Sequence, residues 1–260
     1  MRLKIIKLIK KKNKLPIVCL TAYSKNISKI LDKYCDVILI GDSLGNVLYN
    51  MKSTRNVTLD MMIKHAQSVK AGIKKSLCVV DMPFNTYNNK KEALINAKKI
   101  IKQTKCDAVK IESNKKNFNI IKHLIKSKIQ VMGHIGYTPQ YKKKFKIEGT
   151  SDAGEVKLIN EAKKIESAGA FSIVLECIAP NTSKKITSSI KIPTIGIGSS
   201  KYCDGQILVT DDILGISGFY PKFVKRYANL NSIIEKAVKK YSKEIKGKIF
   251  PSQKNFLYGK

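Results

Sequence analysis

The stretch AVKIESNKKNFNIIKHLIKSKIQVMGH, residues 108–134, contains two short apolar runs separated by an amphipathic segment. The runs 108–112 and 129–134 are too short for buried helices and have the length of buried strands. The segment 119–126 between them has the pattern of a helix with one apolar face. A strand, a helix and a second strand in this order predict a βαβ unit, in which the two strands are parallel.

The same alternation extends over the rest of the chain. The predicted strands are residues 17–22, 36–41, 77–81, 108–112, 129–134, 172–176, 192–198 and 206–209. The predicted helices between them are residues 26–33, 59–71, 91–104, 119–126, 153–168 and 183–189. The strands are apolar throughout, as is typical of parallel strands that are covered on both faces. Eight of them in 260 residues predict an α/β fold, a (β/α)8 TIM barrel. We expect a single barrel domain over residues 1–260, with a short amphipathic helix at its N-terminus.

The net charge of +31 has two interpretations. A strongly basic balance is typical of nucleic-acid-binding proteins. However, Arg occurs only at positions 2, 55 and 226, and Lys is spread over the whole chain together with many Ile and Asn. Proteins that read DNA bases rely on the planar Arg side chain, which is rare in this chain. The abundant residues Lys, Ile and Asn have in common that their codons are rich in A and T. We therefore favour biased genome composition and expect no nucleic-acid partner.

The composition also indicates the compartment. With 43% hydrophobic residues the chain is expected to be globular, and no apolar run reaches the roughly 18 residues of a membrane-spanning helix. The N-terminus lacks the apolar core and cleavage site of a secretory signal. The six Cys form no CxxC pair, and most lie in or beside apolar runs, as buried thiols in a reducing compartment do. We expect a cytoplasmic protein with no structural zinc site and no membrane partner.

Polar residues end five of the predicted strands. In a parallel barrel the active site collects at the carboxyl ends of the strands, so these residues are the candidates for chemistry. They are Asp42, Ser43, Asp81, Lys110, Glu112, His134 and Glu176. In a barrel, four carboxylates, one Lys and one His would meet at one mouth.

Several of these residues have alternative interpretations. Asp often follows a strand as a helix cap or turn former, which suits Glu112 and Glu176 less well. His134 is either a site residue or a buried histidine with satisfied hydrogen bonds. Lys110 could form a Schiff base or hold an anionic substrate as a point charge, and a nearby metal favours the second role.

The clustered carboxylates predict a bound divalent metal. Several carboxylates in one pocket repel one another unless a cation neutralises them, and oxygen ligands select a hard ion such as Mg2+. The Gly-rich runs 41–45 (GDSLG) and 196–200 (GIGSS) also follow strands, but neither matches a nucleotide-binding motif. Tight turns after the strands are sufficient to explain them.

A series of motifs resembles the ketopantoate hydroxymethyltransferase family. In chain order they are LTAY (20–23), GDSLGNV (41–47), DMPF (81–84), VKIE (109–112), GHIGYTPQ (133–140), VLEC (174–177), IPTIGIG (192–198), CDGQILV (203–209) and PKFVKRY (221–227). The resemblance is collinear from about residue 20 to 227. It implies a (β/α)8 barrel that uses Mg2+ and 5,10-methylenetetrahydrofolate to hydroxymethylate 3-methyl-2-oxobutanoate to 2-dehydropantoate, in pantothenate and coenzyme A biosynthesis. It also implies a homo-oligomer, often a decamer.

The resemblance assigns roles residue by residue. Asp42, Asp81 and Glu112 match the metal-associated acids, some of which act through water. Asp42, Ser43, Asp81 and Lys110 match the substrate contacts, and Glu176 matches the proton acceptor. His134 is an additional candidate for the base.

Departures from the family pattern lie outside these residues. The Lys-rich loop 141–151 is shorter than usual and reads KKFKIEG at 143–149, where a stretch that opens with GGY is typical, and Tyr137 and Ser199 replace a common Leu and Ala. These changes affect the expected closure of the loop over the site more than the type of reaction. Two other functions stay open at this point, another metal-dependent barrel acting on a 2-oxo acid and a Lys-rich nucleic-acid binder.

Overall fold

The computed structural model describes residues 2–114, 117–142, 144–218 and 220–257. The chain divides into two compact units, Met1–Thr210 and Asp211–Lys260, which are described separately. The expectation of a single domain over residues 1–260 stays a prediction.

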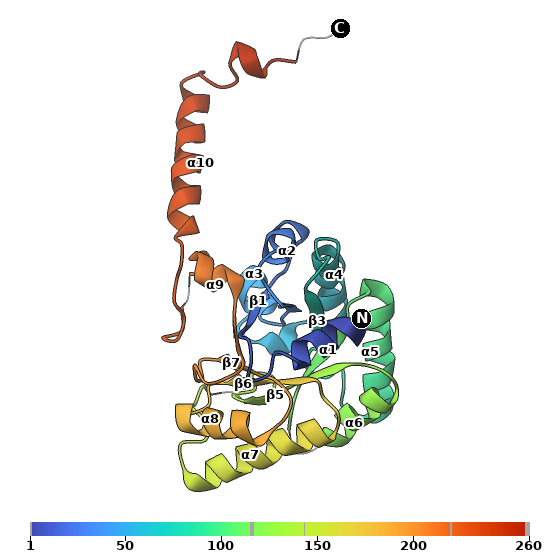
Figure 1. Ribbon diagram of the computed structural model, residues 1–260. Coiled ribbons are helices and arrows are strands. Elements are labelled where there is room, and N and C mark those ends of the chain that lie inside the picture. The colour runs from blue at the N-terminus through green and yellow to red at the C-terminus, as the bar shows by residue number, and fades with distance from the viewer. Residues whose placement is uncertain (1, 115–116, 143, 219, 258–260) are drawn as a thin grey trace. The chain divides into compact units, whose positions relative to one another are not determined.

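The first unit is built on eight parallel strands that close into a barrel in sequence order (Figure 1). The strands are β1 (Ile17–Thr21), β2 (Val37–Ile40), β3 (Leu77–Asp81), β4 (Ala108–Glu112), β5 (Val131–Gly136), β6 (Ser172–Glu176), β7 (Thr194–Ile197) and β8 (Gly205–Leu208). The barrel closes where β1 pairs with β8, Ile17 opposite Gly205. The predicted (β/α)8 TIM barrel is therefore confirmed.

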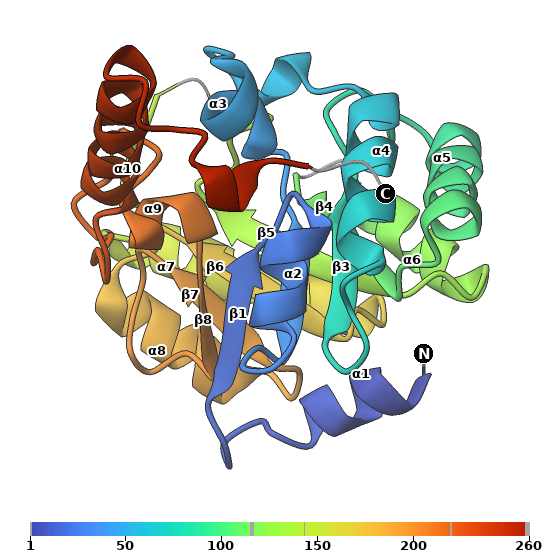
Figure 2. The same ribbon diagram turned by 90° about the horizontal axis from the view of Figure 1, so that it is seen from above.

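Helices surround the strands, as Figure 2 shows from above. They are α1 (Arg2–Ile9), α2 (Lys25–Leu31), α3 (Leu44–Tyr49), α4 (Leu59–Lys70), α5 (Lys90–Thr104), α6 (Phe118–Lys126), α7 (Asp152–Ser167) and α8 (Pro180–Ser189), with a 3-10 turn at Thr54–Asn56. Side-chain caps define several starts, since Thr58, Asn89 and Ser151 each accept a hydrogen bond from a backbone N–H of the first turn. α9 (Thr210–Leu214) follows β8.

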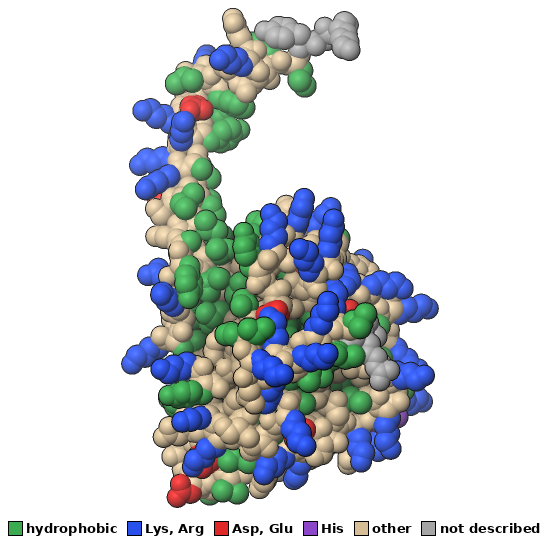
Figure 3. All heavy atoms as spheres, in the orientation of Figure 1, with side chains coloured by type: hydrophobic (Ala, Val, Ile, Leu, Met, Phe, Trp, Pro, Cys, Tyr) green, Lys and Arg blue, Asp and Glu red, His purple; other side chains and the backbone are tan. Residues whose placement is uncertain are grey.

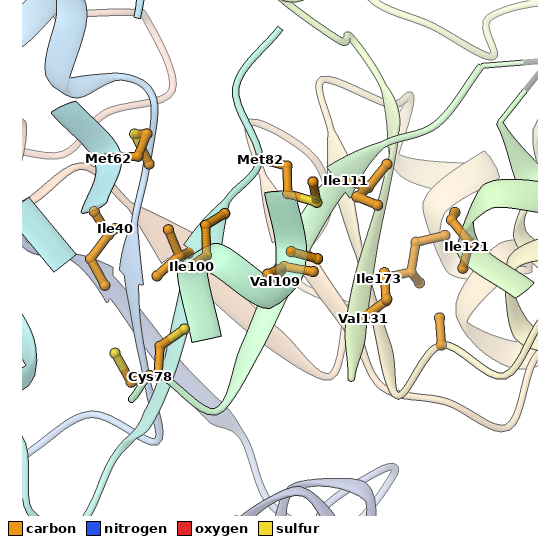
Figure 4. Packing of buried hydrophobic residues seen from close by; sticks show 14 of the residues in the cluster. Ile40, Met62, Cys78, Met82, Ile100, Val109, Ile111, Ile121, Val131 and Ile173 are labelled. Atoms are coloured by element: carbon orange, nitrogen blue, oxygen red, sulfur yellow. The ribbon is translucent and has the colours of Figure 1, made fainter. Parts of the chain in front are cut away.

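The apolar core has two layers. The larger lies between the strands and the outer helices, where Met62 of α4 and Ile121 of α6 belong to the same buried cluster as Ile40 of β2 and Ile173 of β6 (Figure 4). The smaller cluster includes strand residues such as Leu77, together with Ile5 and Leu8 of α1. Strands buried on both faces have to be apolar throughout, which explains their continuous hydrophobicity.

The α1 segment lies at the amino end of the barrel. Lys4 Nζ donates to the carbonyl of Ser76, which directly precedes β3, over 2.8 Å. Lys12 Nζ pairs with Asp204, the residue before β8, also over 2.8 Å. These contacts, with the buried side chains of α1, close the end of the barrel opposite to the strand carboxyl ends.

Most of the predicted bounds differ from the observed ones by a few residues, and two differences from the predictions lie near the strand carboxyl ends. The fifth strand begins at residue 131, not 129, because the N–H of Ile129 bonds to the carbonyl of Leu124 and completes the end of α6. His134 therefore lies within β5 and does not end it. The GDSLG run is not only a turn, since its residue Leu44 begins α3 and is fully buried.

The second unit contains α10 (Leu230–Lys246) and a 3-10 turn at Gln253–Asn255. Asn229 caps α10 by accepting a hydrogen bond from the N–H of Ser232. No described residue of α10 is buried, and the apolar residues Val238 and Tyr241 are more than half exposed.

Lysine and arginine side chains are spread over the face of the barrel unit that Figure 3 shows, and they also occur along α10. In the parts of the chain that the structure describes, none of the helices combines the length and the apolar content of a membrane span.

The side chain of Asp32 joins the end of α2 to the start of β3. Its carboxylate accepts hydrogen bonds from the backbone N–H groups of Lys74, Lys75 and Ser76, over 2.9, 3.0 and 2.7 Å. Burial raises the pKa of Asp32, but these hydrogen bonds, led by that of Ser76, together outweigh it and lower the pKa below its ordinary value.

We expect Asp32→Asn to destabilise the barrel by about 1 to 3 kcal/mol at pH 7, because an amide cannot accept all the bonds that the carboxylate accepts. The lowered pKa means that this contribution is present above the pKa of the unfolded chain and is lost as the pH falls through that of the folded protein. The difference from wild type should therefore shrink towards pH 3 in thermal unfolding. Asp60→Asn is the control, because Asp60 is exposed and its ion pair with Lys99 lies at the surface. An equal effect of both substitutions would contradict the expectation.

Candidate active site

The strand ends bring the predicted residues together at the carboxyl end of the barrel. Register sets the neighbours, since Asp81 lies opposite Lys110 and Glu112 lies opposite His134 in adjacent strands. β6 places Glu176 opposite Gly136, two residues beyond His134. Asp42 and Ser43 directly follow β2 and lead into α3.

A buried ion pair forms one side of the site. Lys110 Nζ donates to Asp81 Oδ1 over 2.6 Å, and the other oxygen of Asp81 accepts the backbone N–H of Asp42 over 3.1 Å. Burial lowers the pKa of Lys110, but the attraction of Asp81, Asp42 and Glu112 outweighs it and raises the pKa above its usual value. The Lys110 side chain therefore carries a positive charge at neutral pH.

The carboxylates of Asp42 and Glu112 are buried, and neither forms an ion pair with a lysine or arginine that the structure describes. Burial and the neighbouring Asp81 raise the pKa of Asp42 to about 7. Burial and the charge of Asp42 raise the pKa of Glu112 well above its usual range. One lysine does not neutralise the negative charge of this pocket.

Gln140 connects these two carboxylates and was not predicted as a site residue. Its side-chain Nε2 donates to Asp42 Oδ2 over 2.8 Å, and its backbone N–H donates to Glu112 Oε2 over 3.0 Å. Its side-chain oxygen accepts a hydrogen bond from the hydroxyl of Tyr87. Gln140 ends the GHIGYTPQ motif but lies beyond the end of β5, so a rule based on strand ends does not select it.

His134 lies between two glutamates. Its Nε2 is 3.2 Å from Glu176 Oε2, and its Nδ1 is 3.8 Å from Glu112 Oε1. Neither ring nitrogen makes a well-aligned hydrogen bond to a residue that the structure describes. Burial and the charge of Lys110 lower the pKa of His134, so the ring is neutral at pH 7.

Glu176 is the most accessible of the four acidic side chains. Its side chain is 19% exposed, whereas those of Glu112 and Asp81 are 2% and 4% exposed. On the other side of the site the Ser43 hydroxyl lies 2.8 Å from the hydroxyl of Tyr23. Glu176 and Ser43 are thus partly exposed beside a buried, charged interior.

The loop after β5 is tied to the chain that follows Glu176. The N–H of Glu148 bonds to the carbonyl of Cys177, and the N–H of Ala179 bonds to the carbonyl of Glu148. Lys142 Nζ adds an ion pair to Glu148 Oε1 over 2.6 Å. Residue 143 of this loop lies outside the described residues, and closure of the loop over the site stays a prediction.

The remaining sequence features have structural roles. The hydroxyl of Ser199, in the GIGSS run, donates to the carbonyl of Ile178 over 3.1 Å and lies 2.8 Å from that of Ser183. All six cysteines are buried and unpaired, as expected for thiols that act as small apolar side chains.

The donor set fits a hard divalent cation. The pocket holds buried carboxylate oxygens in excess over its single lysine, and these are the ligands that Mg2+ prefers. Among residues 2–114, 117–142, 144–218 and 220–257, no group of three or more His, Cys, Asp or Glu side chains is arranged to enclose an ion. Mg2+ is usually bound in proteins by one or two carboxylates, with water and substrate as the other ligands.

Solved structures with the same fold have little sequence in common with this chain. A phosphonopyruvate hydrolase matches with a TM-score of 0.64 at 9% identity, covering 98% of this chain and 92% of its own. A 2,3-dimethylmalate lyase of the PEP mutase/isocitrate lyase superfamily matches with a TM-score of 0.62 at 11% identity, covering 97% and 88%. At this level of identity the likeness shows the fold alone.

Sequence relatives are much closer. The 3-methyl-2-oxobutanoate hydroxymethyltransferase of Pelagibacter ubique is 55% identical over 255 residues, which cover 98% of this chain and 99% of the relative. The enzyme of the same name from Anaplasma marginale (strain St. Maries) is 45% identical over 98% of this chain and 93% of its own. The model of the ketopantoate hydroxymethyltransferase family matches residues 2–253. On this evidence the chain belongs to the ketopantoate hydroxymethyltransferase family.

Proposed function

We propose that this protein transfers a hydroxymethyl group from 5,10-methylenetetrahydrofolate to 3-methyl-2-oxobutanoate, giving 2-dehydropantoate for pantothenate biosynthesis. The observation that carries the proposal is the connected cluster at the barrel mouth, in which a buried lysine and carboxylates adjoin the more accessible Glu176. Relatives of the same length that are named for this activity support it.

The proposed cation is Mg2+. Asp42, Asp81 and Glu112 would hold it directly or through water. When bound, it would stabilise the negative charge that develops on the 2-oxo oxygen as the C3 proton leaves. Asp81 already has one oxygen on Lys110 and one on the N–H of Asp42, so its position is set by the protein.

Glu176 is the proposed base. A carboxylate that removes a proton from a substrate has to reach it, and Glu176 is partly exposed while its neighbour His134 is 2% exposed. His134 is neutral and its Nε2 lies 3.2 Å from Glu176 Oε2, so it places no full positive charge beside that carboxylate. The proton that leaves C3 is then held on the Glu176 carboxylate.

Lys110 and Ser43 are the proposed contacts to the substrate anion. Lys110 uses one N–H on Asp81, and an ammonium group has two further donors. Ser43 is partly exposed and its hydroxyl can donate to a carboxylate oxygen. The C3 carbon then bonds to the methylene carbon of the folate, and both carbon–nitrogen bonds of that carbon break. Water supplies the hydroxyl group. The two nitrogens take up the C3 proton and one proton of that water, so that tetrahydrofolate is released.

The cytoplasmic location, predicted from the cysteines and the N-terminus, belongs to the proposal. So does the homo-oligomeric state, with a decamer as one form, which the family resemblance predicts. Size-exclusion chromatography with light scattering measures the oligomer directly.

We expect exhaustive chelation to abolish formation of 2-dehydropantoate, and addition of Mg2+ to restore it. The physical reason is that the pocket holds more buried carboxylates than its single lysine neutralises. Titration of Mg2+ into the chelated protein by calorimetry measures binding without turnover. Full activity after chelation would show that no divalent cation is needed.

Glu176→Gln is expected to slow exchange of the C3 hydrogen of 3-methyl-2-oxobutanoate with deuterated water by about 10²- to 10⁴-fold, because the amide keeps the shape but cannot take a proton. The exchange is measured by NMR without folate, and substrate affinity should change little. Exchange at the wild-type rate would exclude Glu176 as the base and make His134→Asn the next variant to measure.

Lys110→Ala should weaken substrate binding about 10- to 100-fold, as expected for loss of one charge-assisted hydrogen bond. Lys110→Arg keeps the charge but cannot form a Schiff base, so it should recover part of the affinity. Lys99→Ala, at an exposed ion pair, serves as the control. A substrate adduct trapped on Lys110 by borohydride would show that the residue acts covalently instead.

A further inference from the structure

Gln140 is held at both its backbone and its side chain. Arg55 Nε donates to the carbonyl oxygen of Gln140 over 2.7 Å, and the guanidinium group of Arg55 lies 5.0 Å above the ring of Phe84. Gln140 is 1% exposed, and each of its polar groups makes a hydrogen bond. A glutamine with this many partners has one fixed position at the mouth of the barrel.

The hydrogen-bond partners of the Gln140 side chain determine which way its amide faces. The Tyr87 hydroxyl donates to the amide oxygen. The amide nitrogen donates to the carbonyl of Met82 over 3.0 Å and to Asp42 Oδ2 over 2.8 Å. A flipped amide would place its oxygen against these two acceptors, so only one orientation is satisfied.

The same residue engages one oxygen on each of two carboxylates. Asp42 Oδ2 accepts from the side chain of Gln140, and Glu112 Oε2 accepts from its backbone N–H. The other two oxygens, Asp42 Oδ1 and Glu112 Oε1, accept no hydrogen bond from the residues that the structure describes. Each carboxylate therefore has one oxygen committed to the protein and one available.

We propose that Gln140 is a positioning residue that makes Asp42 and Glu112 single-oxygen ligands, directly or through water, of the cation at this site. The inference rests on the metal site of the proposed function and adds a role for a residue outside it. An octahedral ion has a limited number of positions, and a 2-oxo acid that chelates it needs two of them. A carboxylate free to turn its second oxygen to the ion would compete for those positions.

Replacement of the side-chain amide should affect the acid more than the cation. Gln140→Met keeps the length of the side chain and the backbone N–H to Glu112, but it releases Asp42 Oδ2. The released Asp42 carboxylate can bind the ion with both oxygens. This second contact offsets the affinity for Mg2+ that is lost when the carboxylate is no longer held in one position. We expect the affinity for 3-methyl-2-oxobutanoate at saturating Mg2+ to fall about 10-fold or more, and the affinity for Mg2+ alone to change by less than about threefold.

The test measures the two affinities separately by calorimetry on the full chain, with Mg2+ alone and then with the acid at saturating Mg2+. Tyr87→Phe is the second variant, because it removes the hydrogen bond to the amide oxygen while leaving the ring in the core; its effect should have the same direction and be smaller. Gln67→Met is the control, since Gln67 donates its amide to a backbone carbonyl between outer helices, 3.3 Å from Gln103 O. The unfolding temperature of each variant is measured beside the affinities.

Each of the following outcomes either supports or contradicts the positioning role of Gln140 or the metal site on which it rests. Weaker binding of the acid with nearly unchanged binding of Mg2+, in Gln140→Met and Tyr87→Phe but not in Gln67→Met, supports the positioning role. Wild-type affinity for the acid in both variants overturns it, as does a joint fall of both affinities with the unfolding temperature. If Gln140→Met does not fold, Tyr87→Phe alone decides. Wild-type protein that binds the acid but no Mg2+ would refute the metal site of the proposed function, which is a different failure from that of Gln140.

Discussion

An excess of buried negative charge at one end of the barrel governs the arrangement of the site. Asp42, Asp81, Glu112 and Glu176 come from four different strand ends, and Lys110 is the cation that adjoins them among the described residues. Such a cluster is stable only when protons, hydrogen-bond donors or a bound cation offset the repulsion. The structure shows the first two at work: the pKa values of Asp42 and Glu112 are raised, and Gln140 donates to both carboxylates. A divalent cation, as proposed above, would offset the charge that these leave.

Much of the fold and the site followed from simple regularities in the sequence. A closed parallel barrel requires strands that are apolar on both faces, and β3, β4 and β6 have the bounds that their apolar runs predicted. The polar residues that end such strands have to meet at one mouth, so Asp81, Lys110 and Glu176 could be selected without knowledge of any contact. Their neighbours in space depend on register, which the pattern of apolar residues does not specify.

The residues that escaped prediction lie in connections between elements. Gln140 lies four residues beyond the end of β5, and its place beside Asp42 depends on how the following loop folds back. Tyr87, in the segment after β3, carries no local signal that its hydroxyl meets an amide 53 residues away. The glycine-containing run 41–45 did not predict α3. Leu44 and Gly45 are buried by tertiary packing, in which Val57 and Met51 lie against Gly45. Local propensity is a weak guide where packing decides the conformation.

The lysines spread over the surface have an effect on kinetics that does not depend on the site. With a net charge of +31, the protein is surrounded by a positive potential that extends roughly one Debye length, about 8 Å at physiological ionic strength. Small anions such as 2-oxo acids are concentrated in this layer whichever side they approach from, and the acidic mouth is then reached by diffusion over the surface. The rate of encounter is consequently tied to the salt content of the medium, even though the interior chemistry is shielded from it. The lysine-rich composition thus has a physical consequence for the rate of collisions with anions.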